Sequence, residues 1–201
     1  MNMKAKQAKF HIHEPLESLF SQVIESIGED KNREGLLETP KRMAKMYREV
    51  FSGLLEDPAS VLSKTFPGEG TKDIILVHDI PFYSMCEHHF VPFFGKVHIG
   101  YIPRDRILGL SKFARLVDIF AKRPQVQEKL TNQIAQSISE ALDADGVLVV
   151  IEAEHLCMSM RGIKKPGSTT TTVCRTGVFA ADSQLENRFF NMLGRTGHVQ
   201  N

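Results

Sequence analysis

The amino-acid sequence predicts an α+β fold in which an antiparallel four-stranded sheet carries helices on one face and follows an N-terminal helical extension. Apolar residues recur at helical spacing in the first third of the chain, and a stretch with Pro67, Gly68 and Gly70 then interrupts the pattern. Beyond it the segments follow the order strand, strand, helix, helix, strand, strand, which is typical of α+β layers. The predicted regions are a flexible tail at 1–13, a helical region at 14–66 and a larger domain at 67–201.

Two helices are predicted before the interruption. The first covers about residues 16–27, because apolar side chains recur there every three or four positions and Gly28 then provides a stop. The second begins at Thr39-Pro40, since proline is favoured at the first helical position, and continues to Gly53. Residues 63–71 are interpreted as a linker.

The larger domain shows strand and helix periodicity in turn. In the segment 93–102, Val97, Ile99 and Tyr101 alternate with polar residues, so one face of this strand is expected to be buried. The threonine run at 169–172 is assigned to a strand because threonine is β-branched. The predicted strands are 73–83, 93–102, 146–158 and 170–179, and the predicted helices are 111–122, 126–142 and 182–193.

Composition places the chain among globular proteins with one ordinary domain and room for a helical appendage. Its 201 residues are 42% hydrophobic and 24% charged, which is enough to bury a core. The net charge of +1 lacks the basic footprint of a duplex-binding protein, so a bound anion would need a local cluster of cations. Three cysteines, no secretory signal and no membrane-length apolar stretch predict a cytoplasmic protein without a nucleic-acid or membrane partner, whose thiols are free for a metal.

A Cys-x-x-His pair and a later His-x-Cys pair supply candidate metal ligands. In a helix or tight turn Cys86 and His89 share one face, whereas His88 projects about 200° away, so the spacing favours His89 as the partner of Cys86. In a strand, His155 and Cys157 point to the same face. Two thiolates and one imidazole would form a three-ligand zinc set with a fourth position open for water, as in catalytic sites. Taken singly, such residues are also common as buried structural side chains.

Five basic side chains could together form an anion site. Ser111 is a good helix N-cap, and two cations in the turn after it oppose the helix dipole at a cost of a few tenths of a kcal/mol each, roughly. Helix N-termini with added cations bind anions well, although each cation alone also fits an ordinary solvated surface. A polyphosphate would suit the whole set. Its members are Arg42, Lys45, Lys112, Arg115 and Arg161.

Glu128 lies two positions after Val126 and therefore projects roughly opposite the apolar stripe of its predicted helix. Periodicity alone predicts that this side chain is exposed to solvent. A carboxylate is also a natural acceptor for the adjacent N–H donors of a guanine edge. Both interpretations of Glu128 stay open on these grounds.

Several motifs, taken together in chain order, resemble the GTP cyclohydrolase I family. The resemblance extends over about residues 15–195 and includes Glu38-Thr39-Pro40 and Arg161-Gly162. The N-terminal tail falls outside it, and the stretch at 173–181 is not among the matching segments, so Cys174 receives no role. The four segments that carry the resemblance are Cys86-Glu87-His88-His89-Phe90-Val91-Pro92, Leu108-Gly109-Leu110-Ser111-Lys112, Arg123-Pro124-Gln125-Val126-Gln127-Glu128 and His155-Leu156-Cys157.

This resemblance implies the tunnelling fold, whose subunits join their sheets into a barrel and build sites at subunit contacts, and it implies a decamer. It also implies zinc-dependent conversion of GTP and water to 7,8-dihydroneopterin triphosphate and formate, the first step toward folate or tetrahydrobiopterin. The implied residues are Cys86, His89 and Cys157 for zinc, His88 and His155 for acid/base steps, Ser111 for the later rearrangement, Glu128 and Gln127 for guanine, and Arg42, Lys45, Lys112, Arg115 and Arg161 for the triphosphate.

Three alternatives stand beside this interpretation. A zinc nucleoside deaminase has a similar ligand set, but its His-x-Glu and Pro-Cys-x-x-Cys motifs do not occur in the sequence. A non-catalytic zinc module that binds a partner or nucleic acid would favour four ligands and a basic stripe, whereas three ligands and a low net charge are found. The third alternative is a tunnelling-fold relative that acts on another pterin or purine.

Overall fold

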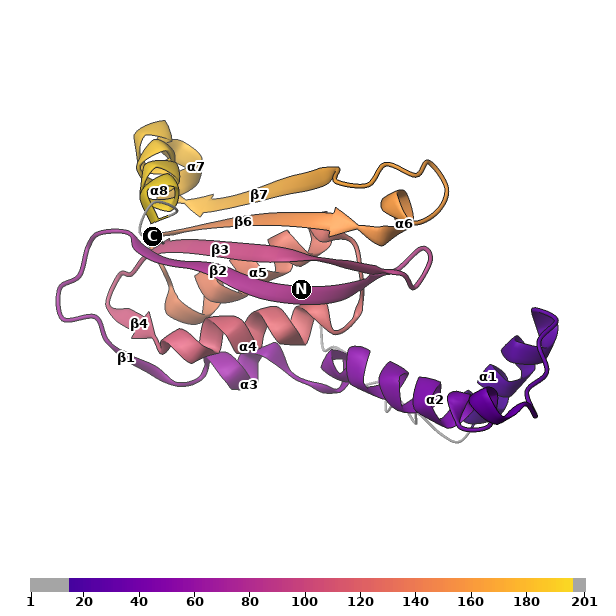
Figure 1. Ribbon diagram of the computed structural model, residues 1–201. Helices are drawn as coiled ribbons and strands as arrows, with labels where there is room; N and C mark the ends of the chain where they lie inside the picture. Colours follow the sequence, from indigo (N-terminus) through magenta and orange to yellow (C-terminus); the bar gives the residue numbers. More distant parts are fainter. Residues whose placement is uncertain (1–14, 197–201) are drawn as a thin grey trace, which may run out of the picture.

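The structure is a computed structural model that describes residues 15–196 (Figure 1), and the tail predicted at 1–13 lies outside the described residues. No helix in this described part is long and apolar enough to cross a membrane. In chain order the elements are α1 (Pro15–Ser26), η1 (Glu34–Leu36), α2 (Thr39–Val50), η2 (Ser52–Leu55), α3 (Pro58–Leu62), β1 (Thr65–Pro67), β2 (Ile75–Cys86), β3 (Pro92–Ile102), β4 (Arg106–Leu108), α4 (Leu110–Ala121), β5 (Pro124–Gln125), α5 (Gln127–Leu142), β6 (Gly146–His155), α6 (Leu156–Ser159), β7 (Thr169–Gly177), α7 (Val178–Ala181) and α8 (Ser183–Thr196).

The main sheet has the strand order β5-β2-β3-β6-β7. The pairs β2–β3, β3–β6 and β6–β7 are antiparallel, which confirms the predicted α+β arrangement around an antiparallel sheet. The additional strand β5 has two residues and runs parallel to the end of β2, where Cys86 lies opposite Gln125. Part of the stretch interpreted as a linker also forms structure, because β1 pairs with β4 in a small second sheet.

Helices α4 and α5 cover one face of the main sheet and bury the larger core against it (Figure 1). Val97, Ile99 and Tyr101 point into this core and are at most 1% exposed, as the strand alternation predicts. The opposite face is covered at one end by α7 and α8, where Phe189 packs against Leu148 in a smaller core. The helices therefore lie mainly on one face, and the C-terminal helix closes one end of the other.

The strand predicted at 146–158 is shorter in the structure. It ends at His155, and Cys157 lies in the short helix α6, which begins at Leu156. The expectation that His155 and Cys157 share one face of a strand is therefore wrong, because the chain turns helical directly after His155. The last strand likewise ends early, at Gly177, whose φ of 54° leads the chain into α7.

Helices α1 and α2 extend beyond the end of the sheet that carries the β2–β3 turn (Figure 1). Ring contacts run through them, with centroid separations of 4.8 Å from Phe20 to Tyr47 and 5.5 Å from Tyr47 to Phe51. Phe51 in turn lies 5.2 Å from Phe90, which belongs to the β2–β3 turn. The N-terminal helices are therefore packed against the turn that follows Cys86.

Candidate active site

The β2–β3 turn presents the first pair of predicted ligands. Cys86 ends β2, and its carbonyl accepts hydrogen bonds from the N–H groups of His89 at 3.3 Å and Phe90 at 2.8 Å. These bonds wind residues 87–90 into one tight turn, which Phe90 ends with a φ of 49°. The chain is therefore tightly turned here, one of the two conformations considered from the sequence, and the turn brings His89 to the side of Cys86.

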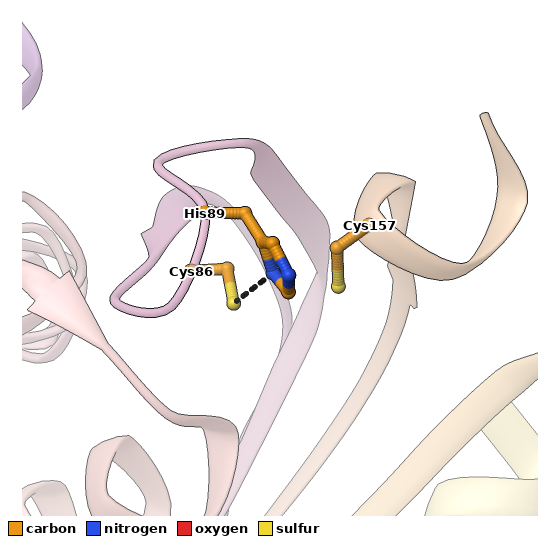
Figure 2. A group of neighbouring side chains, drawn as sticks. All are labelled: Cys86, His89 and Cys157. Atoms are coloured by element: carbon orange, nitrogen blue, oxygen red, sulfur yellow. Dashed lines mark hydrogen bonds between the residues drawn. The ribbon is translucent and has the colours of Figure 1, made fainter. Parts of the chain in front are cut away.

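Cys157 completes a group of three candidate metal ligands with Cys86 and His89 (Figure 2). Their ligand atoms all lie within 4.8 Å of one another, and Cys86 Sγ is 4.0 Å from His89 Nδ1. Two sulfurs and one imidazole nitrogen match the donor set of a tetrahedral zinc site that keeps one position for a non-protein ligand. The predicted trio is thus brought together, although its members come from a turn and a short helix some seventy residues apart.

The surroundings of Cys157 disfavour its thiolate form. Burial raises the pKa of the Cys157 thiol, and the neighbouring Cys86 raises it further. A divalent cation between the two sulfurs would reverse this effect, because metal binding stabilises the thiolate and releases its proton. Cys86 and Cys157 are free rather than joined in a disulfide, so both sulfurs are available to a metal.

His88 also approaches Cys86, which the helical projection does not predict. Its Nδ1 lies 3.7 Å from Cys86 Sγ, and its ring plane makes an angle of 76° with that of His89. The turn is too short and too tightly closed to follow regular helix geometry, so the expected separation of His88 from Cys86 holds only in part. His88 remains exposed to solvent beside the three ligands.

His155 is held on two sides at the end of β6. Its ring stacks on Phe93 with centroids 4.7 Å apart and planes 1° apart, and its Nε2 lies 2.7 Å from Gln127 Oε1. Burial lowers the pKa of His155, and the nearby Glu128 carboxylate opposes this shift. The site therefore contains an oriented imidazole whose surroundings favour the neutral form.

A cavity of about 200 Å³ is bordered by Cys86, His88, His155 and Cys157. Most small-molecule sites measure ~300–1,000 Å³, so a single chain offers room for only part of a nucleotide. Glu128 borders the cavity from the first turn of α5 and is exposed, as its position in the helix predicts. The lining residues are Cys86, His88, Phe93, Gln125, Val126, Gln127, Glu128, His155, Cys157, Met158 and Thr170.

Ser111 and Lys112 lie at the far end of α4 from this cavity, and Arg115 lies near the middle of the helix. The near end is held beside the site by a 2.7 Å hydrogen bond from a serine hydroxyl of β2 to the Ala121 carbonyl. Because α4 has 12 residues, its ends are separated by ~18 Å, which is too far for both to reach one nucleotide base. The N-cap of α4 is Gly109, so the prediction that Ser111 caps this helix is wrong.

The remaining three cations are divided between two places. Arg161 follows α6 and places its Nη1 3.2 Å from His89 Nε2. Arg42 and Lys45 are exposed on α2, and no hydrogen bond or ion pair within residues 15–196 joins their side chains to the cavity lining. One chain therefore gathers the zinc, acid/base and guanine candidates but leaves most of the triphosphate candidates dispersed.

Sequence patterns did not single out several residues that support the site. Phe93 stacks on His155, and Thr172 places its Oγ1 3.1 Å from Gln127 Nε2. The alternation of apolar and polar residues along β3 could have placed Phe93 on the buried face, but this pattern does not indicate which residue Phe93 stacks on. The threonine run was correctly assigned to a strand, and only the pairing of β7 with β6 brings Thr172 to the start of α5.

Residues 16–194 match the family model of GTP cyclohydrolase I. The chain is 56% identical over 171 residues to GTP cyclohydrolase 1 of Clostridium perfringens, which covers 85% of this chain and 92% of that relative. It is 58% identical over 171 residues to GTP cyclohydrolase 1 of Bacillus subtilis, with 85% and 90% covered. A crystal structure of the archaeosine synthase QueF-Like in the apo form aligns with 52% of this chain and 94% of that chain, at 19% identity and a TM-score of 0.44. The family model and the bacterial relatives show that the chain belongs to the GTP cyclohydrolase I family of enzymes.

Proposed function

We propose that the protein catalyses the zinc-dependent conversion of GTP and water to 7,8-dihydroneopterin triphosphate and formate, in the cytoplasm, as the first step toward folate or tetrahydrobiopterin. The observation that carries the proposal is a group of three candidate metal ligands, two of which, Cys86 and Cys157, line the same cavity as His88, His155 and Glu128. Membership of the GTP cyclohydrolase I family supports the same substrate and reaction class.

Cys86, His89 and Cys157 are the residues that would hold the zinc ion. Bound zinc supplies a Lewis acid with an open coordination position and lowers the pKa of water toward neutrality. Two thiolates would leave the centre formally neutral and a milder Lewis acid than three imidazoles would give. The proton transfers are therefore expected to depend strongly on the two histidines.

The other cavity residues are assigned roles by their chemistry. Glu128 accepts the adjacent N–H donors of the guanine edge, which a carboxylate matches well. His88 protonates nitrogen 7 of the base while water adds at carbon 8, and His155 serves the later proton transfers that release formate. Histidine suits these steps because its ordinary pKa lies near neutrality.

A second subunit is proposed to complete the triphosphate site. In one chain Ser111 and Lys112 lie about a helix length from the cavity, Arg115 lies midway along α4, and the cavity volume of about 200 Å³ admits only part of GTP. A neighbouring copy would bring its own α4 N-terminus to this opening, as expected for a decamer with sites at subunit contacts. Arg42, Lys45 and Arg161 would then add to the same phosphate-binding set.

Mixed oligomers test this arrangement. Lys112→Ala and His88→Ala proteins are each expected to turn over GTP slowly, because each lacks one part of every site. Co-assembly of the two variants should restore activity, since some sites then combine an intact His88 from one subunit with an intact Lys112 from its neighbour. Formate release by co-expressed variants, compared with the sum of the separate variants, measures the gain. The absence of any gain would contradict a shared site.

Turnover of GTP tests the reaction itself. Purified protein incubated with GTP is expected to release formate and a product that becomes a fluorescent pterin after oxidation. The variant His88→Ala should keep its zinc while kcat falls by ~10²–10⁴-fold, which is the usual contribution of a general acid. Zinc content and formate release are measured on the same samples.

A matched control is available on β2, the strand that leads into the turn of His88. His78 hydrogen-bonds Asp79 at 2.6 Å and does not line the cavity, so His78→Ala should retain turnover. Normal turnover by His88→Ala would remove the role assigned to His88. Release of ammonia without formate would favour the deaminase alternative instead.

A further inference from the structure

The side-chain amide of Gln127 has one possible orientation. Gln127 is 1% exposed, and its Nε2 lies 3.0 Å from the Ile151 carbonyl, 2.9 Å from the Thr170 carbonyl and 3.1 Å from Thr172 Oγ1. Carbonyl oxygens only accept hydrogen bonds, so the amide nitrogen must face the strands. A flipped amide would place its oxygen against two carbonyl oxygens. The oxygen of Gln127 therefore points away from β6 and β7.

That oxygen determines where His155 carries its hydrogen. Gln127 Oε1 lies 2.7 Å from His155 Nε2, and an amide oxygen has no hydrogen to donate. Nε2 must therefore be the donor, and the neutral ring keeps its lone pair on Nδ1. The parallel stack on Phe93, with planes 1° apart, holds the plane of the same ring. Both the orientation and the tautomer of His155 are set by its neighbours.

Two threonine hydroxyls complete the arrangement behind the amide. The Thr131 hydroxyl donates its hydrogen to the main-chain carbonyl of Gln127 at 2.7 Å, so this hydrogen is not available to another acceptor. Thr172 Oγ1, 2.7 Å from Thr131 Oγ1, must then donate to Thr131, and its lone pairs face Gln127 Nε2, whose two hydrogens are shared among three acceptors. The chain of hydrogen bonds begins and ends on Gln127, which ties the first residue of α5 to β7.

We infer that Gln127 is a positioning residue, which holds His155 with its hydrogen on Nε2 and leaves Nδ1 as the atom that exchanges protons with the substrate. The inference rests on the proposed function, in which His155 is an acid/base group. Both amide hydrogens of Gln127 face acceptors on β6 and β7. Recognition of guanine therefore falls to Glu128 rather than to the Gln127 side chain, in contrast to the role that the family resemblance implies for Gln127.

Nitrogen-15 NMR of histidine-labelled protein tests the tautomer in the unaltered chain. His155 is expected to show the pattern of a ring protonated on Nε2, identified by the signals that are missing from His155→Gln. A ring protonated on Nδ1 would overturn the inference. This measurement requires neither turnover of GTP nor a folded variant of Gln127.

Gln127→Met provides the kinetic test, because methionine keeps the approximate shape and removes the amide. We expect both tautomers of His155 to appear and kcat to fall by at least ~10-fold, the lower end of the cost of losing a partner that orients a functional imidazole, with KM for GTP unchanged. The control Gln133→Met lies on the same helix and loses a 2.8 Å hydrogen bond to Gln125 Nε2. It should keep kcat and a single tautomer.

The outcomes separate the two proposals. A raised KM with unchanged kcat in Gln127→Met would make its side chain a guanine contact and overturn the positioning role. Conversion of GTP by a protein whose His155 is protonated on Nδ1 would overturn the positioning role alone. Failure of every sample to convert GTP, with the expected NMR pattern, would overturn the proposed function and leave the hydrogen-bond relation between Gln127 and His155 supported.

Discussion

Replacing Cys157 with alanine is expected to remove zinc and formate release together. The variant keeps Cys86 and His89, but a catalytic zinc site uses three protein ligands, and the two that remain come from a single turn. The loss of affinity should exceed the ~10–100-fold that follows removal of an outer-shell partner. Metal content after gel filtration, measured by mass spectrometry, and formate release from GTP report the two effects separately.

Cys174→Ala is the matched control for this substitution. Cys174 is half-buried on β7, where burial raises the pKa of its thiol, and it is not part of the three-ligand group. The control should therefore keep both zinc and turnover. Zinc bound at full stoichiometry in Cys157→Ala, or formate release at the unaltered rate, would contradict the proposed metal centre. Far-UV circular dichroism checks that both variants remain folded.

One added methyl group at Gly95 is expected to destabilise the sheet by at least ~3 kcal/mol, the upper part of the usual cost of overpacking. Gly95 pairs with Phe82 on β2 and with Ala153 on β6. An alanine Cβ at this position would lie 1.8 Å from the Glu152 carbonyl oxygen and 2.7 Å from Ala153 Cα. Both neighbours are backbone atoms, so β3 and β6 would have to separate.

We also expect the active site to be distorted, because the pair formed by Phe93 and His155 lies two positions from Gly95 along the same strands. Urea denaturation of Gly95→Ala measures the free energy of unfolding. Gly194→Ala serves as the control, since within residues 15–196 its added Cβ meets no atom within 4 Å apart from its chain neighbours and the backbone of its own helix, and alanine is favoured over glycine within α8 by up to ~1 kcal/mol. Equal midpoints for Gly95→Ala and the unaltered protein would contradict the close approach of β3 to β6.

The spacing of apolar residues predicted the layers well, because side chains on the buried face of a helix or strand recur at the period of that element. The alternation of Val97, Ile99 and Tyr101 placed the buried face of β3 correctly. The same approach failed after His155, since a short apolar run does not distinguish a strand from a helical turn. Strand β5 was missed for a related reason: its two residues form a strand only by pairing with the end of β2.

The ligand types, the pairing of Cys86 with His89 and the amphipathic helices could be inferred from the sequence, because they depend on residues only a few positions apart. The approach of Cys157 to Cys86 required the tertiary structure. The antiparallel register of β3 and β6 pairs Phe93 with His155, and it brings the start of one strand beside the end of the other. Two further features also required the tertiary structure: the contact between Gln127 and His155, and the distance from the first turn of α4 to the cavity. They depend on packing between segments that are far apart in the chain, and periodicity carries no information about such contacts.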